Sequence, residues 1–229
     1  MLLTRLPAGR LGGAVPTLAQ ASWAFPLAGA LVGAIVAGLL AGGQALGWQA
    51  PVAAGVALVA GLLATGGLHE DGLADVADGF GGGHTRERKL EIMKDSRLGS
   101  YGAIALVMAL GLRWLLLAQV GGAASVIALA VASRAVLVAA LAAMPAARAD
   151  GLGRMAAGVG PWRVAVALML GMLALAVLGP IPAMKAGAAM AAATVALGWL
   201  ARRQIGGQTG DVLGAMQIAA EIAGWLALA

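Results

Sequence analysis

The chain contains a long stretch without formal charge near its beginning. No Asp, Glu, Lys or Arg occurs from residue 11 to residue 69. A helix needs about 20 apolar residues to cross a bilayer, and two such runs fit here, at 24–46 and 50–68. A sequence of this kind has no plausible way to cover itself with polar surface in water, so the bilayer is its simplest solvent.

Five further apolar runs follow this stretch. They lie near 100–120, 123–143, 163–181, 184–201 and 212–228, and the whole chain is 61% hydrophobic and only 11% charged, where soluble domains carry about 25% charged residues. We therefore predict an all-α, polytopic membrane helix bundle of about seven spans with cytoplasmic catalytic loops. Residues 1–229 are interpreted as one integral membrane domain, in which the first apolar run is retained rather than cleaved as a signal peptide.

The basic residues are distributed unevenly between the two sides that these spans create. Twelve of the 15 Lys and Arg fall in the N-terminus and in segments 69–98, 145–163 and 202–211, and Lys185 stands alone on the other side. The positive-inside rule then puts the first side in the cytoplasm, as in a multi-pass protein of the inner membrane. No basic stripe with interleaved aromatics is present, so nucleic acid is not an expected partner.

The acidic residues concentrate in one segment, from His69 to Asp78. Asp71, Asp75 and Asp78 have relative positions 0, 4 and 7, which share one face of a helix. Like charges at this spacing repel each other, and Mg²⁺, which prefers carboxylate oxygens and phosphates, would offset that repulsion. The competing interpretation is a solvated acidic helix at the membrane surface.

Glycines and basic residues follow this cluster. The glycine-rich run 79–83 would allow either close approach to a phosphate or a hinge, and 86–99 reads as an amphipathic interfacial helix capped by Thr85. Lys94 and Arg97 fit either phosphate binding or topology alone. Arg113 and Arg134 lie inside spans, where arginines are usually paired or face a polar cavity. Acids, arginines and glycines together favour transfer of a phosphorus centre.

The motifs resemble those of the cobalamin synthase family. The segment 66–79, with Leu-His-Glu-Asp-Gly-Leu-Ala-Asp-Val-Ala-Asp-Gly at its centre, and the segment 86–102 carry the resemblance, and blocks at 3–7, 25–33, 133–134, 150–153 and 207–215 extend it over nearly the whole chain. The resemblance implies an Mg²⁺-dependent adenosylcobinamide-GDP ribazoletransferase activity. In that reaction α-ribazole or its 5′-phosphate displaces GMP and forms adenosylcobalamin or its phosphate.

This resemblance, together with the charges, gives a set of expected site residues. The expected catalytic residues are His69, Asp75, Lys94, Arg97 and Arg134. The expected substrate-binding residues are Gly79, Gly82, Ser96, Asp150 and Asp211. The expected Mg²⁺ ligands are Glu70, Asp71, Asp75, Asp78 and Asp95. Expected partners are corrinoid and nucleoside substrates and the lipid bilayer, with a possible homo-oligomer.

Two other functions fit parts of the pattern. Phosphotransferases of the CDP-alcohol type also place acids on helices at the cytoplasmic face, but they set Ala-Arg after the first Asp-Gly, whereas Leu-Ala-Asp follows Asp71 and Gly72 here. A permease or scaffold would place acids along a path within the spans. Glu221 is the one acid inside a predicted span, so the pattern favours the transferase.

Overall fold

Helices make up the regular secondary structure of the computed structural model, which describes residues 3–5, 17–148 and 158–229. One isolated bridge joins Ala146 and Gln208 within these ranges. The helices are α1 (Leu18–Ala21), the 3₁₀ helix η1 (Ser22–Ala24), α2 (Phe25–Ala45), α3 (Ala50–Thr65), α4 (Leu68–Gly82), α5 (Arg86–Ile92), α6 (Ser100–Val120), α7 (Ala123–Ala143), α9 (Pro161–Ala176), α10 (Pro180–Ile205) and α11 (Gly210–Leu228). The prediction of an all-α polytopic membrane protein is confirmed.

Each of the seven predicted apolar runs corresponds to a helix. By length and composition, however, five helices of the described residues could cross a membrane alone, or six if α3 and α4 form one bent span. Helix α9 is apolar but has only 16 residues. Helix α10 is longer than its predicted run because prolines are accepted in a first turn, and because Arg202 and Arg203 in its last turn interact favourably with the helix dipole.

A sharp corner joins α3 to α4. The two helices are bent by 86°, and the corner consists of Gly66 and Gly67 at φ +70° and +69°, a left-handed conformation that glycine adopts without steric cost. The Thr65 hydroxyl accepts a hydrogen bond from the Gly67 amide at 3.3 Å, and the Arg5 amide donates to Ala64 O at 2.8 Å. The corner therefore directs the acidic helix α4 away from the axis of α3.

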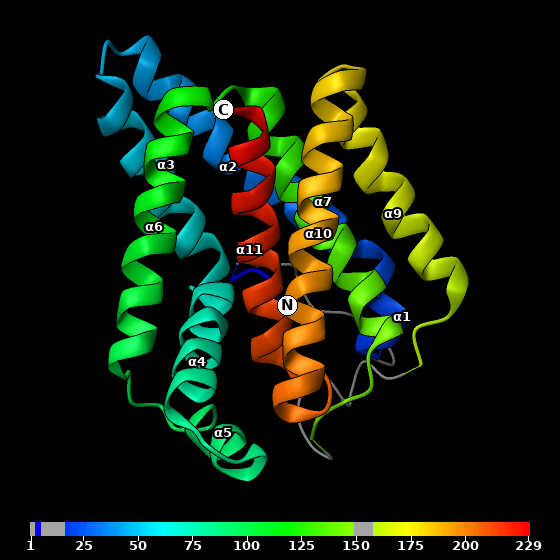
Figure 1. Cartoon of the computed structure of the whole chain (residues 1–229). Helices are drawn as coiled ribbons and strands as arrows, with labels where there is room; N and C mark the ends of the chain where they lie inside the picture. Colours follow the sequence, from blue (N-terminus) through cyan, green and yellow to red (C-terminus); the bar gives the residue numbers. More distant parts are fainter. Residues whose placement is uncertain (1–2, 6–16, 149–157) are drawn as a thin grey trace.

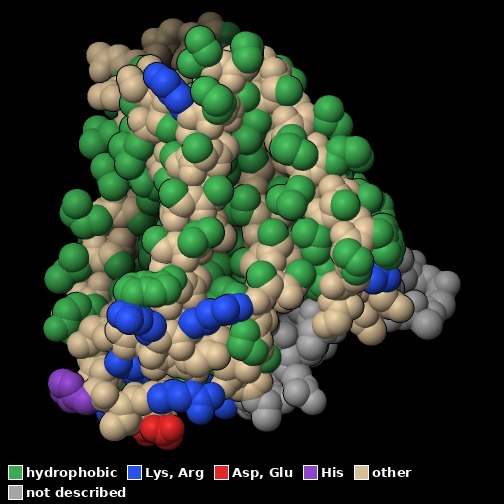
Figure 2. Space-filling view, turned by 45° about the vertical axis from the view of Figure 1, so that its right-hand side comes forward, with side chains coloured by type: hydrophobic (Ala, Val, Ile, Leu, Met, Phe, Trp, Pro, Cys, Tyr) green, Lys and Arg blue, Asp and Glu red, His purple; other side chains and the backbone are tan. Residues whose placement is uncertain are grey.

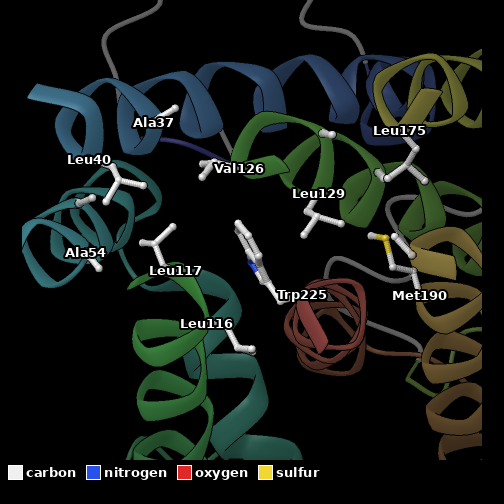
Figure 3. Close-up of a cluster of buried hydrophobic side chains, with 14 of the residues drawn as sticks. Ala37, Leu40, Ala54, Leu116, Leu117, Val126, Leu129, Leu175, Met190 and Trp225 are labelled. Atoms are coloured by element: carbon white, nitrogen blue, oxygen red, sulfur yellow. The ribbon is translucent and has the colours of Figure 1, made fainter. Parts of the chain in front are cut away.

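Helix α11 lies at the centre of the bundle, between α4, α6, α7 and α10 (Figure 1). Its Trp225 occupies the middle of an apolar core that also contains Leu129 and Met190 (Figure 3). Gly224 permits this packing, since a Cβ there would lie 2.6 Å from Leu129 Cδ2. A second apolar core forms at the end of the bundle where α5 and the loops lie, and it includes Ile205, Val212 and Met216.

The outer surface of the bundle is apolar along its sides and basic at one end. Figure 2 shows apolar side chains along the helices and a concentration of Lys and Arg at the end where α5 lies, which we call the loop end. Many large apolar side chains are exposed, among them Leu63, Val107, Val177 and Val195. Such a surface is suited to lipid rather than to water.

The corner between α3 and α4 gives a testable prediction for stability. Gly67→Ala should lower the free energy of unfolding by about 1–2 kcal/mol. A Cβ at Gly67 meets nothing within 4 Å, so the cost is the left-handed backbone alone. Thermal unfolding of the purified protein in detergent measures it. Gly38→Ala in α2 is the matched control, because its Cβ also meets nothing and the residue is helical; equal midpoints for the two variants would contradict the prediction.

Candidate active site

Helix α4 and the start of α11 approach each other closely through glycines. A Cβ on Gly72 would lie 2.7 Å from the carbonyl oxygen of Asp211, and a Cβ on Gly214 would lie 3.2 Å from His69 Cα. The two backbones are therefore in direct contact at these glycines. This contact places the acids of α4 beside Asp211, which the sequence analysis predicted as a substrate-binding residue without linking it to those acids.

Three carboxylates and one arginine gather at this crossing. The carboxylate of Asp75 is half-buried and experiences the negative charges of Asp211 and Asp71 and the positive charge of Arg148. Arg148 Nη1 lies 3.4 Å from Asp211 Oδ2, which also accepts a hydrogen bond of 3.2 Å from the Thr209 hydroxyl. A cavity of about 80 Å³ opens here. His69, Asp71 and Asp211 line it together with apolar side chains and glycines, and we call it the carboxylate cavity.

Backbone contacts hold the surrounding loops together. Arg148 Nη2 donates to Leu90 O at 3.1 Å, and Arg86 donates to Ile205 O at 2.8 Å and to Ala147 O at 3.0 Å. The Gln208 amide also donates to Pro145 O at 2.8 Å. Sequence analysis did not single out Arg86 or Arg148 as site residues, because the contacts of both join segments about 60 or more residues apart in the chain.

Asp78 caps a neighbouring helix. Its carboxylate accepts hydrogen bonds from the amides of Gly99 at 2.7 Å and Gly102 at 2.8 Å, at the N-terminus of α6. A carboxylate is favourable there because the first amides of a helix lack intrahelical partners. Each oxygen of Asp78 thus accepts one hydrogen bond from the protein, which gives this carboxylate a structural role; its role as a metal ligand stays a prediction.

His69 and Glu70 are buried within the bundle. Glu70 Oε1 lies 2.6 Å from Arg113 Nη1, and Arg113 Nη2 lies 3.1 Å from Glu221 Oε1. Glu221 also accepts a hydrogen bond of 2.6 Å from Gln217 Nε2. The expectation that arginines within spans are paired or face a polar cavity is confirmed for Arg113, and Glu70 is engaged in an ion pair.

A small internal cavity adjoins this ion pair. It has a volume of about 40 Å³, and His69, Glu70, Arg113 and Arg134 are among the residues that line it. Arg134 therefore faces a polar cavity, as expected for an arginine within a span. In the described part of the chain, His69 Nε2, Glu70 Oε2 and the Nε atoms of Arg113 and Arg134 have no hydrogen-bond partner. The volume is sufficient for one or more waters. His69 lines both cavities and therefore separates the internal one from the carboxylate cavity.

The turn between α5 and α6 is more exposed than expected. Helix α5 starts at the predicted cap, where Thr85 Oγ1 accepts from the Arg88 amide at 3.2 Å, but it ends at Ile92 instead of continuing to Gly99. Lys94, Ser96 and Arg97 are exposed in this turn. Met93, the residue after α5, is buried.

Asp95 lies in the same turn and pairs with its neighbour. Arg97 Nη2 lies 2.5 Å from Asp95 Oδ2. Hydrogen bonds from Arg97 lower the pKa of the Asp95 carboxyl. The structure therefore places Asp95 in a surface pair, and it does not bring this carboxylate into the lining of the carboxylate cavity.

The glycine run after Asp78 serves packing in this structure. Helix α4 continues to Gly82, and none of the glycines from 79 to 83 has positive φ, so the glycine run forms the end of the helix here. A Cβ on Gly79 would lie 2.4 Å from Met93 Cγ, whereas Gly82 has space for one. Gly79 therefore lets α5 approach α4. Asp150, another expected substrate-binding residue, lies outside the described residues.

The carboxylate cavity fits a metal ion only if other ligands complete its coordination. No group of three or more His, Cys, Asp or Glu side chains among the described residues is placed to hold a metal ion by itself. Mg²⁺, however, is usually bound by one or two carboxylates together with waters and substrate phosphates. The donors at Asp71, Asp75 and Asp211 are oxygen ligands of this kind, so the residues fit an ion shared with a phosphate.

Together these features define a polytopic helical membrane protein that gathers carboxylates and an arginine at its loop end. The chain belongs to the cobalamin-5-phosphate synthase family, since a sequence model of that family matches residues 1–229. This finding confirms the resemblance seen in the motifs, and it does not support the CDP-alcohol phosphotransferase or the permease.

Several similar proteins share one name. An adenosylcobinamide-GDP ribazoletransferase of Bradyrhizobium diazoefficiens is 46% identical over 227 residues, which cover 96% of this chain and 87% of the relative. The protein of that name from Mesorhizobium japonicum is 46% identical over 97% of this chain and 88% of its own length. The one from Chlorobaculum tepidum is 42% identical over 88% of this chain and 82% of its own length. No solved structure matches the chain significantly.

The position of Asp78 gives a prediction that separates capping from metal binding. Asp78→Ala should lower the free energy of unfolding by about 1–2 kcal/mol, because the amides of Gly99 and Gly102 lose their acceptor. Asp71→Ala makes the same chemical change at an exposed position of the same helix and should change it by less than about 0.5 kcal/mol. Thermal unfolding in detergent without added metal measures both. Equal stability of the two variants would show that Asp78 is not a structural cap.

Proposed function

We propose that this chain is an adenosylcobinamide-GDP ribazoletransferase acting in assembly of the nucleotide loop of cobalamin. The main support is the match of the family over residues 1–229, together with relatives of that name at 46% identity over nearly the whole chain. At the loop end, carboxylates that could hold a cation lie beside Arg148, and a cation and an arginine are the positive charges that a diphosphate substrate requires.

The reaction exchanges one phosphorus–oxygen bond for another. A ribose hydroxyl of α-ribazole, or of its 5′-phosphate, attacks the phosphorus that carries the cobinamide. The bond from this phosphorus to the oxygen that bridges it to GMP breaks, and GMP leaves with the electron pair. The hydroxyl proton passes to a base. The products are adenosylcobalamin or its phosphate, and GMP.

The carboxylate cavity is the proposed place for the diphosphate. Mg²⁺, when bound, supplies charge neutralisation on the phosphate oxygens. One or two of the carboxylates of Asp71, Asp75 and Asp211, whose charges interact across the contact between α4 and α11, would hold this ion together with phosphate oxygens. Arg148, at 3.4 Å from Asp211, lies where a guanidinium can donate to phosphate oxygens.

His69 and Arg134 have different proposed roles. His69 lines the carboxylate cavity and is the proposed acceptor of the hydroxyl proton. Arg134 lines the internal cavity but not the carboxylate cavity. It would therefore act through His69 as a positioning residue rather than touch substrate. Lys94, Ser96 and Arg97 are on the exposed turn and remain candidates for binding a phosphate that extends beyond the cavity.

The decisive experiment is release of GMP by purified protein in lipid. Adenosylcobinamide-GDP with α-ribazole should yield GMP only when Mg²⁺ is present. Asp75→Asn should lower kcat about 100-fold or more, because a carboxylate that would hold the ion on the phosphate is lost. Glu91→Gln is the control: it removes one carboxylate from an exposed pair with Arg88 on α5 and should leave turnover unchanged. Absence of GMP release by the wild type would refute the activity, and near-normal turnover of Asp75→Asn would refute the metal role.

We also propose that the loop end faces the cytoplasm across the inner membrane, with residues 1–229 forming one membrane domain. The support is the excess of Lys and Arg at this end over the single Lys185 at the other. A cysteine introduced at His84, between α4 and α5, should be protected from a membrane-impermeant maleimide in intact cells and react after lysis. The chain has no cysteine of its own. A second cysteine variant, at Gly122 between α6 and α7, where the residue is exposed and a Cβ meets nothing closer than 3.7 Å, should react without lysis. The opposite pattern would overturn the orientation.

A further inference from the structure

A large groove separates α9 from α10. The two helices are joined by a short turn ending at Gly179 and diverge toward the loop end (Figure 1). The space between them has a volume of about 490 Å³ and is lined by α7, α9 and α10, mainly through small or apolar side chains such as Ala140, Leu168, Ala191 and Gly198. We call this space the α9–α10 groove, and Figure 2 shows it as a hollow between two apolar ridges.

The groove is basic at its loop end. Arg202 and Trp199 line it there, and Arg203 stacks on Trp199 with its guanidinium carbon 4.3 Å from the ring centroid. Arg163 lies at the start of α9, the other wall, over Trp162 at 4.7 Å. None of the described residues that line the groove is acidic. The groove therefore combines an apolar length with a positive end.

The groove opens onto the surface that faces lipid. Val195 and Trp199, two of its lining residues, are 70% and 56% exposed, and tryptophan is typical of the level at which lipid headgroups lie. The described residues that line the groove include none of those lining the carboxylate cavity. A lipid can therefore enter the groove sideways from the bilayer.

We propose that the α9–α10 groove binds an anionic phospholipid, with an acyl chain along the groove and the phosphate at Arg202. The volume lies within the range of about 300–1,000 Å³ that small-molecule sites commonly have. Basic pockets between membrane helices at the cytoplasmic side are suited to anionic headgroups. Arg202 can bind the phosphate while keeping its hydrogen bond to Ala143 O, because a guanidinium has five N–H donors. A zwitterionic lipid carries a compensating positive charge and gains less from this arginine.

Native mass spectrometry of the purified full chain can test the proposal. The protein is exchanged into an equimolar mixture of phosphatidylglycerol and phosphatidylcholine with the same acyl chains, and the lipid retained after release from the micelle is identified. The wild type should retain phosphatidylglycerol in preference to phosphatidylcholine by about fivefold, the effect of one arginine at an anionic lipid surface. Arg202→Gln should reduce the preference to near unity.

Two further variants separate the groove from general lipid attraction. Ala191→Phe, at an exposed position in the groove, should reduce retention of both lipids by filling the space. Lys185→Gln removes the same charge at the opposite end of α10, where the residue is exposed, and should leave the preference unchanged. Equal retention of the two lipids by the wild type, or an unchanged preference in Arg202→Gln, would overturn the proposal. Because the readout is bound lipid, it is independent of whether the protein releases GMP.

Discussion

The arrangement of the site depends on three charged side chains buried inside the bundle. Arg113 on α6 joins Glu70 on α4 to Glu221 on α11, at 2.6 and 3.1 Å, and the three side chains are only 12–14% exposed. Burying charges is costly, and removing one member of such a set commonly costs about 3–5 kcal/mol because the others are left without compensation. In this protein the ion pairs fix α4 between α6 and α11, and the close contact at Gly72 then places Asp71 and Asp75 beside Asp211.

Helix α4 therefore extends from the buried interior of the bundle to the carboxylate cavity within about four turns. Its first residues, His69 and Glu70, are buried in the bundle, and Asp71 and Asp75 line or adjoin the carboxylate cavity. Asp78 is used to cap α6. The same short helix provides interior pairing, candidate chemistry and the start of a neighbouring helix, which explains why its acids are so densely spaced. This division also distinguishes Asp75, with its acidic neighbours, from Glu70 and Asp78, whose charges are already matched by protein groups.

The sequence predicted the helical membrane fold well, because apolar length is a local property and glycines and prolines mark most helix ends. It also found the acidic segment as a candidate site. It could not predict that Asp78 turns to the amides of Gly99 and Gly102, since helical spacing alone places Asp71, Asp75 and Asp78 on one face. The role of Arg148 depended on contacts with Leu90 and Asp211, 58 and 63 residues away, which no local pattern reveals. The end of α5 at Ile92 was missed because charge and apolar periodicity continue beyond it.

The bend at Gly66 and Gly67 has a consequence for how the protein is made. Helix α3 has 16 residues and a length of about 24 Å, which is shorter than the roughly 30 Å hydrocarbon layer. If α3 and α4 form one bent span, part of the polar helix α4 lies at membrane depth. The partners that neutralise Glu70 come later: Arg113 lies 43 residues further on, and Glu221 is in the last helix. A ribosome that has just completed α4 has produced an acid without its counter-charge. The ion pairs that hold α4 can therefore form only late in biosynthesis. The carboxylate cavity, which Asp211 of α11 helps to line, is complete only after α11 has entered the membrane.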